Sequence, residues 1–408
     1  MNEFWEAKVA LQWGTLKPSY DVVIIGGGGH GLATAYNLAL RHGITNVAVL
    51  ERSYIGGGNS GRNTTVIRSN YGKPEPVRFY QRSLELYRDL EAETERWMMH
   101  DERGLWWITH TEAGRRTEIA RAEINRAFGA DTRFAEPEEI EREIPGINMN
   151  PAGEFPVLGG SFHAGGATAR HDRVVWALAE GAMRAGVDII QGVEVTGLKV
   201  ENNQIVGVET TQGSIATETV VSAVGGHATS VADMAGVRLP IRTHPLQAFV
   251  TNHYEGTFDA IVASIDLGFY VSQTARGEML GGAHIDPQPS YSRRSDHHFI
   301  SSIAKRITAL FPFMGDLRVL RQWTGSCDMS PDYSPVMGRT PVDGFLITTG
   351  WGTWGFKAIP AGGEAMAELV ATGTTPELIA PFSLDRFARD RALADRCLLY
   401  TSPSPRDS

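Results

Sequence analysis

The residues best suited to hold a cofactor form a glycine-rich motif near the start of the chain. Residues 26–31 read Gly-Gly-Gly-Gly-His-Gly, directly after an apolar, β-branched run and at the start of a helical pattern. In a dinucleotide-binding motif of this spacing, Gly26 allows a tight turn, Gly28 lets the backbone approach a pyrophosphate, and Gly31 lets the helix pack closely on the sheet. The free N–H groups at the start of the helix would then face the pyrophosphate.

An acidic residue at a fixed distance strengthens this interpretation. Glu51 lies twenty residues after Gly31, at the end of a second apolar run, where it would accept hydrogen bonds from an adenosine ribose. The alternative, a merely flexible glycine turn, accounts for neither the strand and helix around the motif nor the acid. We therefore predict that the cofactor contacts include Glu51 and, in the motif itself, Gly26, Gly28, Gly29, His30 and Gly31.

The glycine motif alone fits both NAD and FAD, and two further loops help to decide between these cofactors. Residues 56–65 are small or hydrogen-bonding and follow the second strand, where a bound FAD would extend its flavin end. Residues 350–357 precede a predicted helix whose N-terminus could stabilise negative charge near a reduced flavin. The predicted contacts in these loops and in the strand 193–200 are Asn59, Arg62, Thr64, Thr65, Val195, Gly352, Gly355 and Lys357.

Two cations are candidates for binding a substrate. Arg68 and Lys357 could form a carboxylate clamp, because a guanidinium fork and an ammonium group together hold an amino-acid anion, and Tyr71 could add a hydroxyl. For Arg68, a solvated surface position is an equally good interpretation from the sequence alone. Lys357 is the stronger candidate, since a lysine inside a Gly/Trp/Phe loop is an unusual choice for mere solvation.

A histidine at the start of a predicted helix is a candidate for covalent attachment. His171 precedes Asp172 and follows the glycine-containing stretch 165–168. A neutral ring nitrogen at this position is nucleophilic and could attach to the 8α-carbon of a flavin. From the residues alone, a surface histidine that caps the helix is the favoured interpretation. No pair of histidines has the spacing of metal ligands on a helix, so we predict no metal site.

These motifs occur together, and in the same order, in a known family. From about residue 1 to 390 the sequence resembles the beta subunits of heterotetrameric sarcosine oxidase, in the glycine motif and in the segments 59–71, 169–172, 330–332 and 355–357. That family is similar to a wider group of amine oxidases, which includes monomeric sarcosine oxidase, glycine oxidase and dimethylglycine dehydrogenase. The resemblance implies oxidative demethylation of sarcosine to glycine, with Arg68, Tyr71 and Lys357 at the substrate.

The resemblance also implies cofactors and partners. FAD would be bound noncovalently by this chain, FMN would be attached covalently to His171 at the contact with the alpha subunit, and NAD would be held by alpha. Electrons would pass from FAD through FMN to oxygen, and the methylene group would reach tetrahydrofolate or leave as formaldehyde. The complex would contain alpha, gamma and delta subunits beside this chain. Monomeric relatives attach FAD to a cysteine at the position of Gly325, so Cys327, two residues out of register, is expected to be structural.

Two alternatives stay open at this point. The first keeps the reaction class and changes the substrate, because glycine, dimethylglycine, proline or an opine would fit the same clamp. The second makes the chain a flavin-carrying docking subunit whose chemistry takes place in a partner. The presence of both Arg68 and Lys357 favours the catalytic interpretation.

The elements that must position these residues follow from hydrophobic periodicity. Apolar runs at 21–26 and 46–51 flank a helix over 29–42 and form a βαβ unit. Further helices are predicted over 75–97, 111–143, 171–184, 296–311 and 360–371. Further strands are predicted at 187–190, 193–200, 205–210, 219–224, 269–272 and 345–349.

This order predicts an α/β fold, in which a Rossmann-like, FAD-binding parallel sheet is interleaved with an antiparallel-sheet substrate domain. We assign residues 1–75, 156–232 and 323–396 to the FAD-binding domain, and residues 76–155 and 233–322 to the substrate domain. Residues 397–408 look non-native, because they show no periodicity and resemble the in-frame translation of a sequencing adapter.

Composition excludes several other classes of protein. The formal net charge of −9 argues against a nucleic-acid-binding surface, which needs clustered Lys and Arg. Two cysteines cannot make a disulfide framework or a four-thiolate metal site. No apolar stretch reaches the length of a membrane span, and the first residues lack the pattern of a signal peptide, so we predict a cytoplasmic protein that contacts no membrane.

Overall fold

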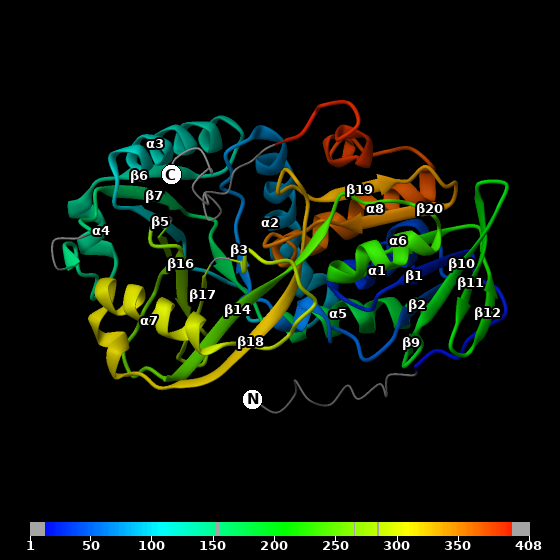
Figure 1. Ribbon diagram of the computed structural model, residues 1–408, viewed down its shortest axis with the longest axis horizontal. Coiled ribbons are helices and arrows are strands. Elements are labelled where there is room, and N and C mark those ends of the chain that lie inside the picture. Colours follow the sequence, from blue (N-terminus) through cyan, green and yellow to red (C-terminus); the bar gives the residue numbers. More distant parts are fainter. Residues whose placement is uncertain (1–12, 152–154, 265, 284, 394–408) are drawn as a thin grey trace.

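The computed structural model describes residues 13–151, 155–264, 266–283 and 285–393. The predicted non-native tail, residues 397–408, lies outside these residues. Figure 1 shows two halves side by side, each built around its own sheet, with the long helix α2 (Pro74–Thr94) between them. The α/β fold class is confirmed.

The half that carries the glycine motif is built on a six-stranded sheet. Its strands are, in spatial order, β19 (Val336–Arg339), β20 (Phe345–Thr349), β13 (Val220–Ser222), β1 (Val22–Ile25), β2 (Val47–Glu51) and β9 (Asp188–Gln191). All neighbours pair in parallel except β19 and β20. The central strands are continuous apolar runs because helices and a second small sheet bury them on both faces.

Helices cover both faces of this parallel sheet. One face packs against α1 (Gly29–His42), α5 (His171–Arg184) and α8 (Ile359–Thr372). The other face packs against α6 (Ala228–Met234) and a three-stranded sheet made of β10 (Val195–Glu201), β11 (Gln204–Thr210) and β12 (Gly213–Ala216). The helix α1 ends at Gly43, whose left-handed backbone (φ 67°) closes the last turn.

The other half is built on an eight-stranded mixed sheet. Its spatial order is β18 (Val319–Met329), β14 (Arg242–His253), β17 (Glu278–Ala283), β16 (Phe269–Gln273), β15 (Ile261–Ser264), β5 (Leu105–Thr109), β7 (Gly159–His163) and β6 (Thr132–Ala135). The pairing is antiparallel as expected, with one exception, because β5 and β15 run parallel. A small sheet of β3 (Val66–Ile67), β8 (Ala167–Thr168) and β4 (Asp101–Glu102) completes the strands of the described residues.

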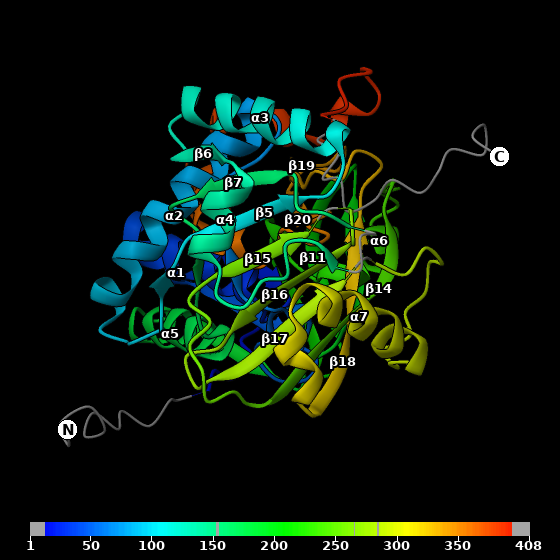
Figure 2. The same ribbon diagram turned by 90° about the vertical axis from the view of Figure 1, so that its left-hand side faces the viewer.

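The two faces of the mixed sheet have different partners, as the alternation of side chains along a strand requires. On β5, Trp106 and Ile108 face outward, where α4 (Pro137–Glu143) and α7 (His297–Leu310) cover the sheet (Figure 2). Leu105 and Trp107 face inward, toward the parallel-sheet half. The helix α3 (Glu112–Ala127) packs on β6 and β7.

The chain passes repeatedly between the two halves. Strands of the parallel sheet come from residues 22–51, 188–222 and 336–349, whereas strands of the mixed sheet come from residues 105–163 and 242–329. The interleaved arrangement is therefore confirmed, while the domain boundaries given above stay a prediction. One predicted helix is wrong: residues 111–143 do not form continuous helical structure, because α3 ends at Ala127 and β6 begins at Thr132.

Candidate functional site

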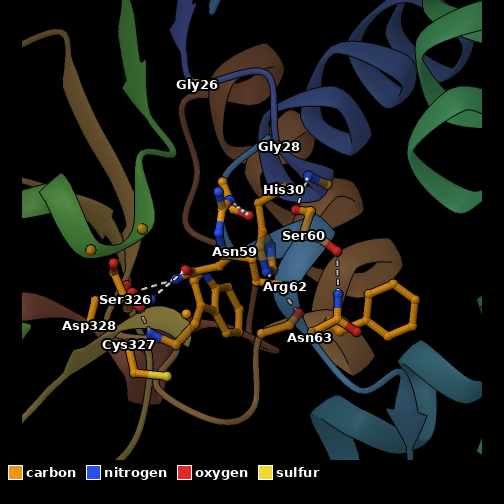
Figure 3. A pocket seen from close by; sticks show the side chains of 18 of the residues that line it. Gly26, Gly28, His30, Asn59, Ser60, Arg62, Asn63, Ser326, Cys327 and Asp328 are labelled. Atoms are coloured by element: carbon orange, nitrogen blue, oxygen red, sulfur yellow. Dashed lines mark hydrogen bonds between the residues drawn. The ribbon is translucent and has the colours of Figure 1, made fainter. Parts of the chain in front are cut away.

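A cavity of about 400 Å³ lies where the two halves meet, and we call it the first cavity. It is lined by the glycine motif, the loop of residues 53–66, the inner face of the mixed sheet and the loop of residues 350–357. Figure 3 shows Gly26, Gly28 and His30 on one side of it and Ser326, Cys327 and Asp328 of β18 on another. We call the part lined by Glu51 and the exposed Arg52 the outer end of the cavity, and the part lined by the buried Arg68 and Lys357 its inner end.

The glycines of the motif let α1 approach the cavity closely, and at its start Gly29 N–H donates a hydrogen bond to the Ser60 hydroxyl (2.9 Å). Gly26 has a positive φ of 109°, which a residue with a side chain rarely adopts. A β-carbon at Gly31 would overlap the carbonyl oxygen of Gly26, and one at Gly29 would overlap Ile359 of α8. The N-cap residue of α1, Gly28, has no capping side chain, so the positive end of the helix faces the cavity.

Glu51, at the end of β2, shapes the turn beside the motif. Its carboxylate accepts hydrogen bonds from the N–H groups of Gly27 (3.0 Å) and Ser53 (2.9 Å). A carboxylate has about four acceptor positions, so the group keeps capacity for a ribose hydroxyl. Val195 also lines the first cavity, and its contact with a nucleotide stays a prediction.

The loop after β2 is fixed to the mixed sheet at several points. The side chain of Asn59 accepts a hydrogen bond from Ser326 N–H (2.9 Å) and donates one to the carbonyl of the same residue. Arg62 donates to the carbonyl oxygens of Gly57 and Gly58. Thr64 donates to the hydroxyl of Tyr270 (2.9 Å), which places one residue of each half in direct contact. Thr65 has a positive φ of 62°.

Two polar side chains hold the late loop of residues 350–357. The carboxylate of Asp328 accepts hydrogen bonds from the Thr349 hydroxyl (3.0 Å) and from Trp351 N–H (3.2 Å). The His30 ring donates through Nε2 to the carbonyl of Gly355 (2.9 Å) and stacks on Trp351, with 4.1 Å between ring centroids. Burial lowers the pKa of His30 to about 3, so the ring is neutral. His30 therefore connects the glycine motif to this loop.

The helix α2 fixes the same loop from its other side. Ser83 donates to the carbonyl of Lys357 (2.6 Å), and Tyr87 donates to that of Phe356 (2.7 Å). Gly350 and Gly352 have positive φ angles of 68° and 53°, which turn the chain sharply before α8. The Lys357 ammonium is thus presented by a backbone that is fixed on both sides.

The two candidate cations are buried at one end of the first cavity. The side chains of Arg68 and Lys357 are each 6% exposed. The Arg68 guanidinium lies over the rings of Tyr71 (4.2 Å) and Trp107 (5.0 Å), and Lys357 Nζ donates to the carbonyl of Thr353 (3.1 Å). Burial at this depth excludes the alternative of a solvated surface arginine. The cations can bind an anion strongly here, because little water screens them.

Two tyrosines near the cations have different positions. Tyr71 does not line the first cavity; its ring packs against Arg68 and stacks on Tyr80, with 4.4 Å between centroids. Tyr270, which belongs to no predicted motif, lines the cavity from β16. Burial raises the pKa of Tyr270 to about 12, so its hydroxyl is protonated at neutral pH. No local pattern marks this tyrosine, since only the pairing of distant strands brings it to the site.

His171 lies in a different place, at the edge of a second cavity of about 520 Å³. It is the first residue of α5, and Arg170 and Asp172 beside it form an ion pair (2.8 Å). Burial is the largest influence on the pKa of His171 and lowers it, so the ring is neutral and its nitrogen is nucleophilic at neutral pH. The second cavity shares with the first a wall formed by residues of the loop after β2: Tyr54, Gly57, Arg62, Asn63 and Thr65.

Cys327 lies on β18 and lines the first cavity. Burial and the charge of Asp328 raise the pKa of its thiol well above the ordinary value, so the group is protonated and a poor nucleophile. Within the described ranges, no cluster of His, Cys, Asp and Glu side chains is placed to hold a metal ion. None of the helices in the described part of the chain has the length and apolarity needed to cross a membrane.

Comparison with known proteins agrees with this architecture. The model of a protein family described as FAD dependent oxidoreductase matches residues 21–369. The chain belongs to this family. The beta subunit of sarcosine oxidase from Rhizobium meliloti (strain 1021) is 44% identical over 373 residues, which are 91% of this chain and 89% of that protein. The subunit of the same name from Arthrobacter sp is 42% identical over 91% of this chain and 92% of its own length.

Solved structures show the same fold. The L-proline dehydrogenase from P. horikoshii is 30% identical, with a TM-score of 0.87 over 92% of this chain and 99% of that one. The glycine oxidase from Geobacillus kaustophilus is 23% identical and shares the fold, with a TM-score of 0.82 over 91% of this chain and 99% of that one. Both comparisons extend over the parallel-sheet half and the mixed-sheet half.

The first cavity fits the FAD of this family. The N-terminus of α1, whose first N–H group donates to Ser60, suits a diphosphate, and Glu51 suits the adenosine ribose. A β-carbon at Gly58 would meet no atom within 4 Å, so the glycine-rich loop after β2 leaves room along the cavity wall. The remaining length of the cavity, up to Arg68 and Lys357, can take the flavin and a small substrate.

Proposed function

We propose that this chain is the beta subunit of a heterotetrameric sarcosine oxidase, and that this subunit oxidises sarcosine to glycine with loss of the methyl group. The observation that carries the proposal is the position of two buried cations, Arg68 and Lys357, on the same cavity as the glycine motif. The identity of 44% to a sarcosine oxidase beta subunit, over nearly the full length of both chains, supports the same assignment.

In this proposal the residues at the inner end of the cavity bind and orient the substrate. Arg68 and Lys357 hold the carboxylate, and the protonated hydroxyl of Tyr270 donates a further hydrogen bond. Loss of the methyl group requires oxidation at the N-methyl carbon, and a bound FAD would supply the hydride acceptor there. Trp107 and Trp354 exclude water around the reacting carbon, which keeps the clamp strong and the geometry fixed.

We infer that FAD is held without a covalent bond. Gly325 occupies the position at which monomeric relatives carry the attaching cysteine, and the raised pKa of Cys327 leaves its thiol unreactive. The backbone of the glycine motif, Glu51 and the loop after β2 hold FAD instead: Gly26, Gly28, Gly29, His30, Asn59, Arg62, Thr64, Thr65, Val195, Gly352 and Gly355 are its proposed neighbours.

We further propose that His171 attaches FMN covalently in the second cavity, at the contact with the alpha subunit. The neutral, half-buried ring and the wall shared with the first cavity support this placement. Gamma and delta subunits, NAD in alpha, and tetrahydrofolate as acceptor of the methylene group complete the proposed complex. Oxygen is the proposed final electron acceptor, and the cytoplasm is the proposed location.

Proline is the second candidate substrate. The L-proline dehydrogenase from P. horikoshii has 30% identity and a TM-score of 0.87 to this chain. Proline, like sarcosine, is a secondary amino acid with one carboxylate, so the same clamp would bind it. The rate of flavin reduction by each compound decides between the two, and faster reduction by proline would replace sarcosine in the proposal.

The clamp is tested by anaerobic stopped-flow reduction of the holoenzyme with sarcosine. Lys357→Met and Arg68→Ala should each weaken the binding of a carboxylate inhibitor about ten- to a hundredfold, because each removes a charged partner. Flavin reduction should slow by roughly a hundredfold, since a shift of about 1 Å in the reacting carbon disrupts hydride transfer.

Matched controls are Lys305→Met on α7 and Arg116→Ala on α3, whose side chains are exposed far from the cavity. Both controls should keep native rates, and the FAD content of all four variants should stay normal. Native reduction and inhibitor binding in both clamp variants would contradict the clamp and favour a docking subunit without chemistry of its own.

A further inference from the structure

Three arginines gather at the outer end of the first cavity, which the proposed substrate clamp does not involve. Arg52 follows β2, Arg62 ends a 3₁₀ turn of the loop after β2, and Arg293 lies between β17 and α7. All three line the first cavity, together with Gly57, Gly58 and Ser60, whose hydroxyl accepts a hydrogen bond from Gly29 N–H at the start of α1 (2.9 Å). We call them the outer arginines.

Arg293 reaches this position from the mixed-sheet half. The segment that carries it, residues 285–296, is a strap that passes over the parallel-sheet half. Ser290 N–H donates to the carbonyl of Thr243 (2.8 Å), and Tyr291 stacks on His227, with 5.4 Å between ring centroids. At its end, Asp296 N–H donates to the side chain of Gln247 on β14 (3.0 Å). Arg293 therefore lies between two anchored points.

The outer arginines bring like charges together. All three side chains line the same cavity, and partial burial together with the charges of Arg62 and Arg52 lowers the pKa of Arg293. Arg52 donates to the neutral ring of His227 (2.8 Å), a partner that supplies no negative charge. The carboxylates nearby are Glu194, 3.9 Å from Arg52, and Glu51, whose oxygens accept backbone hydrogen bonds. An anion at this end of the cavity would relieve the repulsion.

We propose that Arg293 binds the diphosphate of FAD from the strap, on the side opposite the N-terminus of α1. The diphosphate carries two negative charges at neutral pH, and guanidinium groups bind phosphate oxygens in a two-pronged geometry. Arg52 and Arg62 complete the positive wall. The cofactor thereby connects the strap of the mixed-sheet half to the glycine motif, so that FAD binding holds the two halves together at the outer end of the cavity.

Arg294 is a matched control for Arg293, because it is the next residue of the same strap, is also exposed, and does not line the cavity. The holoenzyme is stripped of its noncovalent flavin and titrated with FAD, ADP and adenosine. Arg293→Ala should weaken FAD and ADP about tenfold or more, the worth of one charged contact to phosphate, and leave adenosine unchanged. Arg294→Ala should bind all three ligands like the parent.

Salt and proteolysis give independent measurements. The difference in ADP affinity between Arg293→Ala and the parent should shrink as ionic strength rises, because exposed charges are screened within roughly 10 Å at 0.1 M salt. Trypsin should cut the strap at Arg294 more slowly when FAD is bound to the parent, and Arg293→Ala should lose this protection. Equal ADP affinity in the two alanine variants, or an equal loss for ADP and adenosine, would overturn the proposal. Neither measurement uses sarcosine, so the result is independent of the proposed substrate.

Discussion

The loop after β2 has a cavity on each side, and the two cavities differ in how deeply their lining side chains are buried. The first is lined by glycine backbone and by cations that are 6% exposed, and it lies between the two sheets. The lining of the second includes the exposed side chains of Arg276, Arg321 and Trp176, the last of which is 42% exposed. The inner end of the first cavity can thus enclose a ligand within this chain, while both cavities open to the surface elsewhere.

This difference bears on how each cavity holds a flavin. Backbone N–H groups, a helix N-terminus and buried charges bind a ligand reversibly and tightly when the surrounding fold fixes them. The described lining of the second cavity includes no buried cation, so a covalent bond to His171 and a covering subunit would hold a flavin there. The exposed aromatic side chains at the rim of the second cavity, Tyr54 and Trp176, fit such a cover.

The largest effect is expected from a methyl group in the glycine motif. In Gly31→Ala the new β-carbon overlaps the carbonyl oxygen of Gly26, a backbone atom that cannot turn aside, so α1 must move away from β1. Overpacking of this kind costs roughly 1–3 kcal/mol or more, and the displaced helix no longer presents its N-terminus. The purified holoenzyme should lose nearly all FAD, as measured by the flavin absorbance released on denaturation.

Gly315→Ala is the control for this substitution. Its β-carbon would approach no atom closer than 3.9 Å, and the residue lies far from both cavities, so FAD content and stability should remain native. If Gly31→Ala retains normal FAD, FAD binding in the first cavity does not depend on the close packing of α1 on β1. The proposed difference between noncovalent binding in the first cavity and covalent attachment in the second then loses its main support.

The second effect concerns covalent attachment. In His171→Ala the flavin that stays in the pellet after acid precipitation of the holoenzyme should disappear, while FAD in the supernatant should be unchanged. His171 is the expected nucleophile because its ring lines the second cavity and burial keeps it neutral. His298→Ala, on the exposed face of α7, should keep both flavins. Flavin in the His171→Ala pellet would show that another residue makes the bond.

The helices and strands that could be predicted are those whose pattern lies within one short stretch of the sequence. The strand, turn and helix around the glycine motif follow directly in the sequence, and the predicted helices 29–42 and 171–184 are confirmed to the residue. The strands β5 and β7 were missed, because Trp106 and Trp107 face opposite sides and show no alternation of apolar and polar residues. The strand β6 lies in a charged stretch for which one continuous helix is predicted. The helix in fact ends before Gly129, whose φ is 88°.

The same division holds for the candidate site. Arg68 and Lys357 could be singled out because each lies in a distinctive local sequence. Tyr270 and Arg293 could not, since they reach the first cavity only through strand pairing and the strap. Thr64 and Tyr270, for example, are joined by a hydrogen bond but lie 206 positions apart. Contacts at such separation are decided by the packing of the two sheets, which a single sequence does not display.

The smallest effect is expected from Glu51→Gln, and it tests whether the outer end of the first cavity recognises a ribose or only shapes a turn. The carboxylate accepts hydrogen bonds from Gly27 and Ser53, and a glutamine can keep one of these with its oxygen. If the group also binds the ribose, the loss of charge weakens the binding of FAD and of adenosine by about 1–2 kcal/mol, roughly five- to thirtyfold.

The stability of the flavin-free protein separates the two roles. A ribose contact is absent without ligand, so its loss leaves the melting temperature of the stripped protein within about 2 °C of the parent. If the Glu51 carboxylate only supports the turn, Glu51→Gln should instead lower the melting temperature of the stripped protein and leave its affinity for adenosine unchanged. Glu201→Gln, an exposed position at the end of β10, controls for the loss of one negative charge. Because adenosine lacks the diphosphate, weaker adenosine binding in Glu51→Gln assigns the effect to the nucleoside and not to the outer arginines.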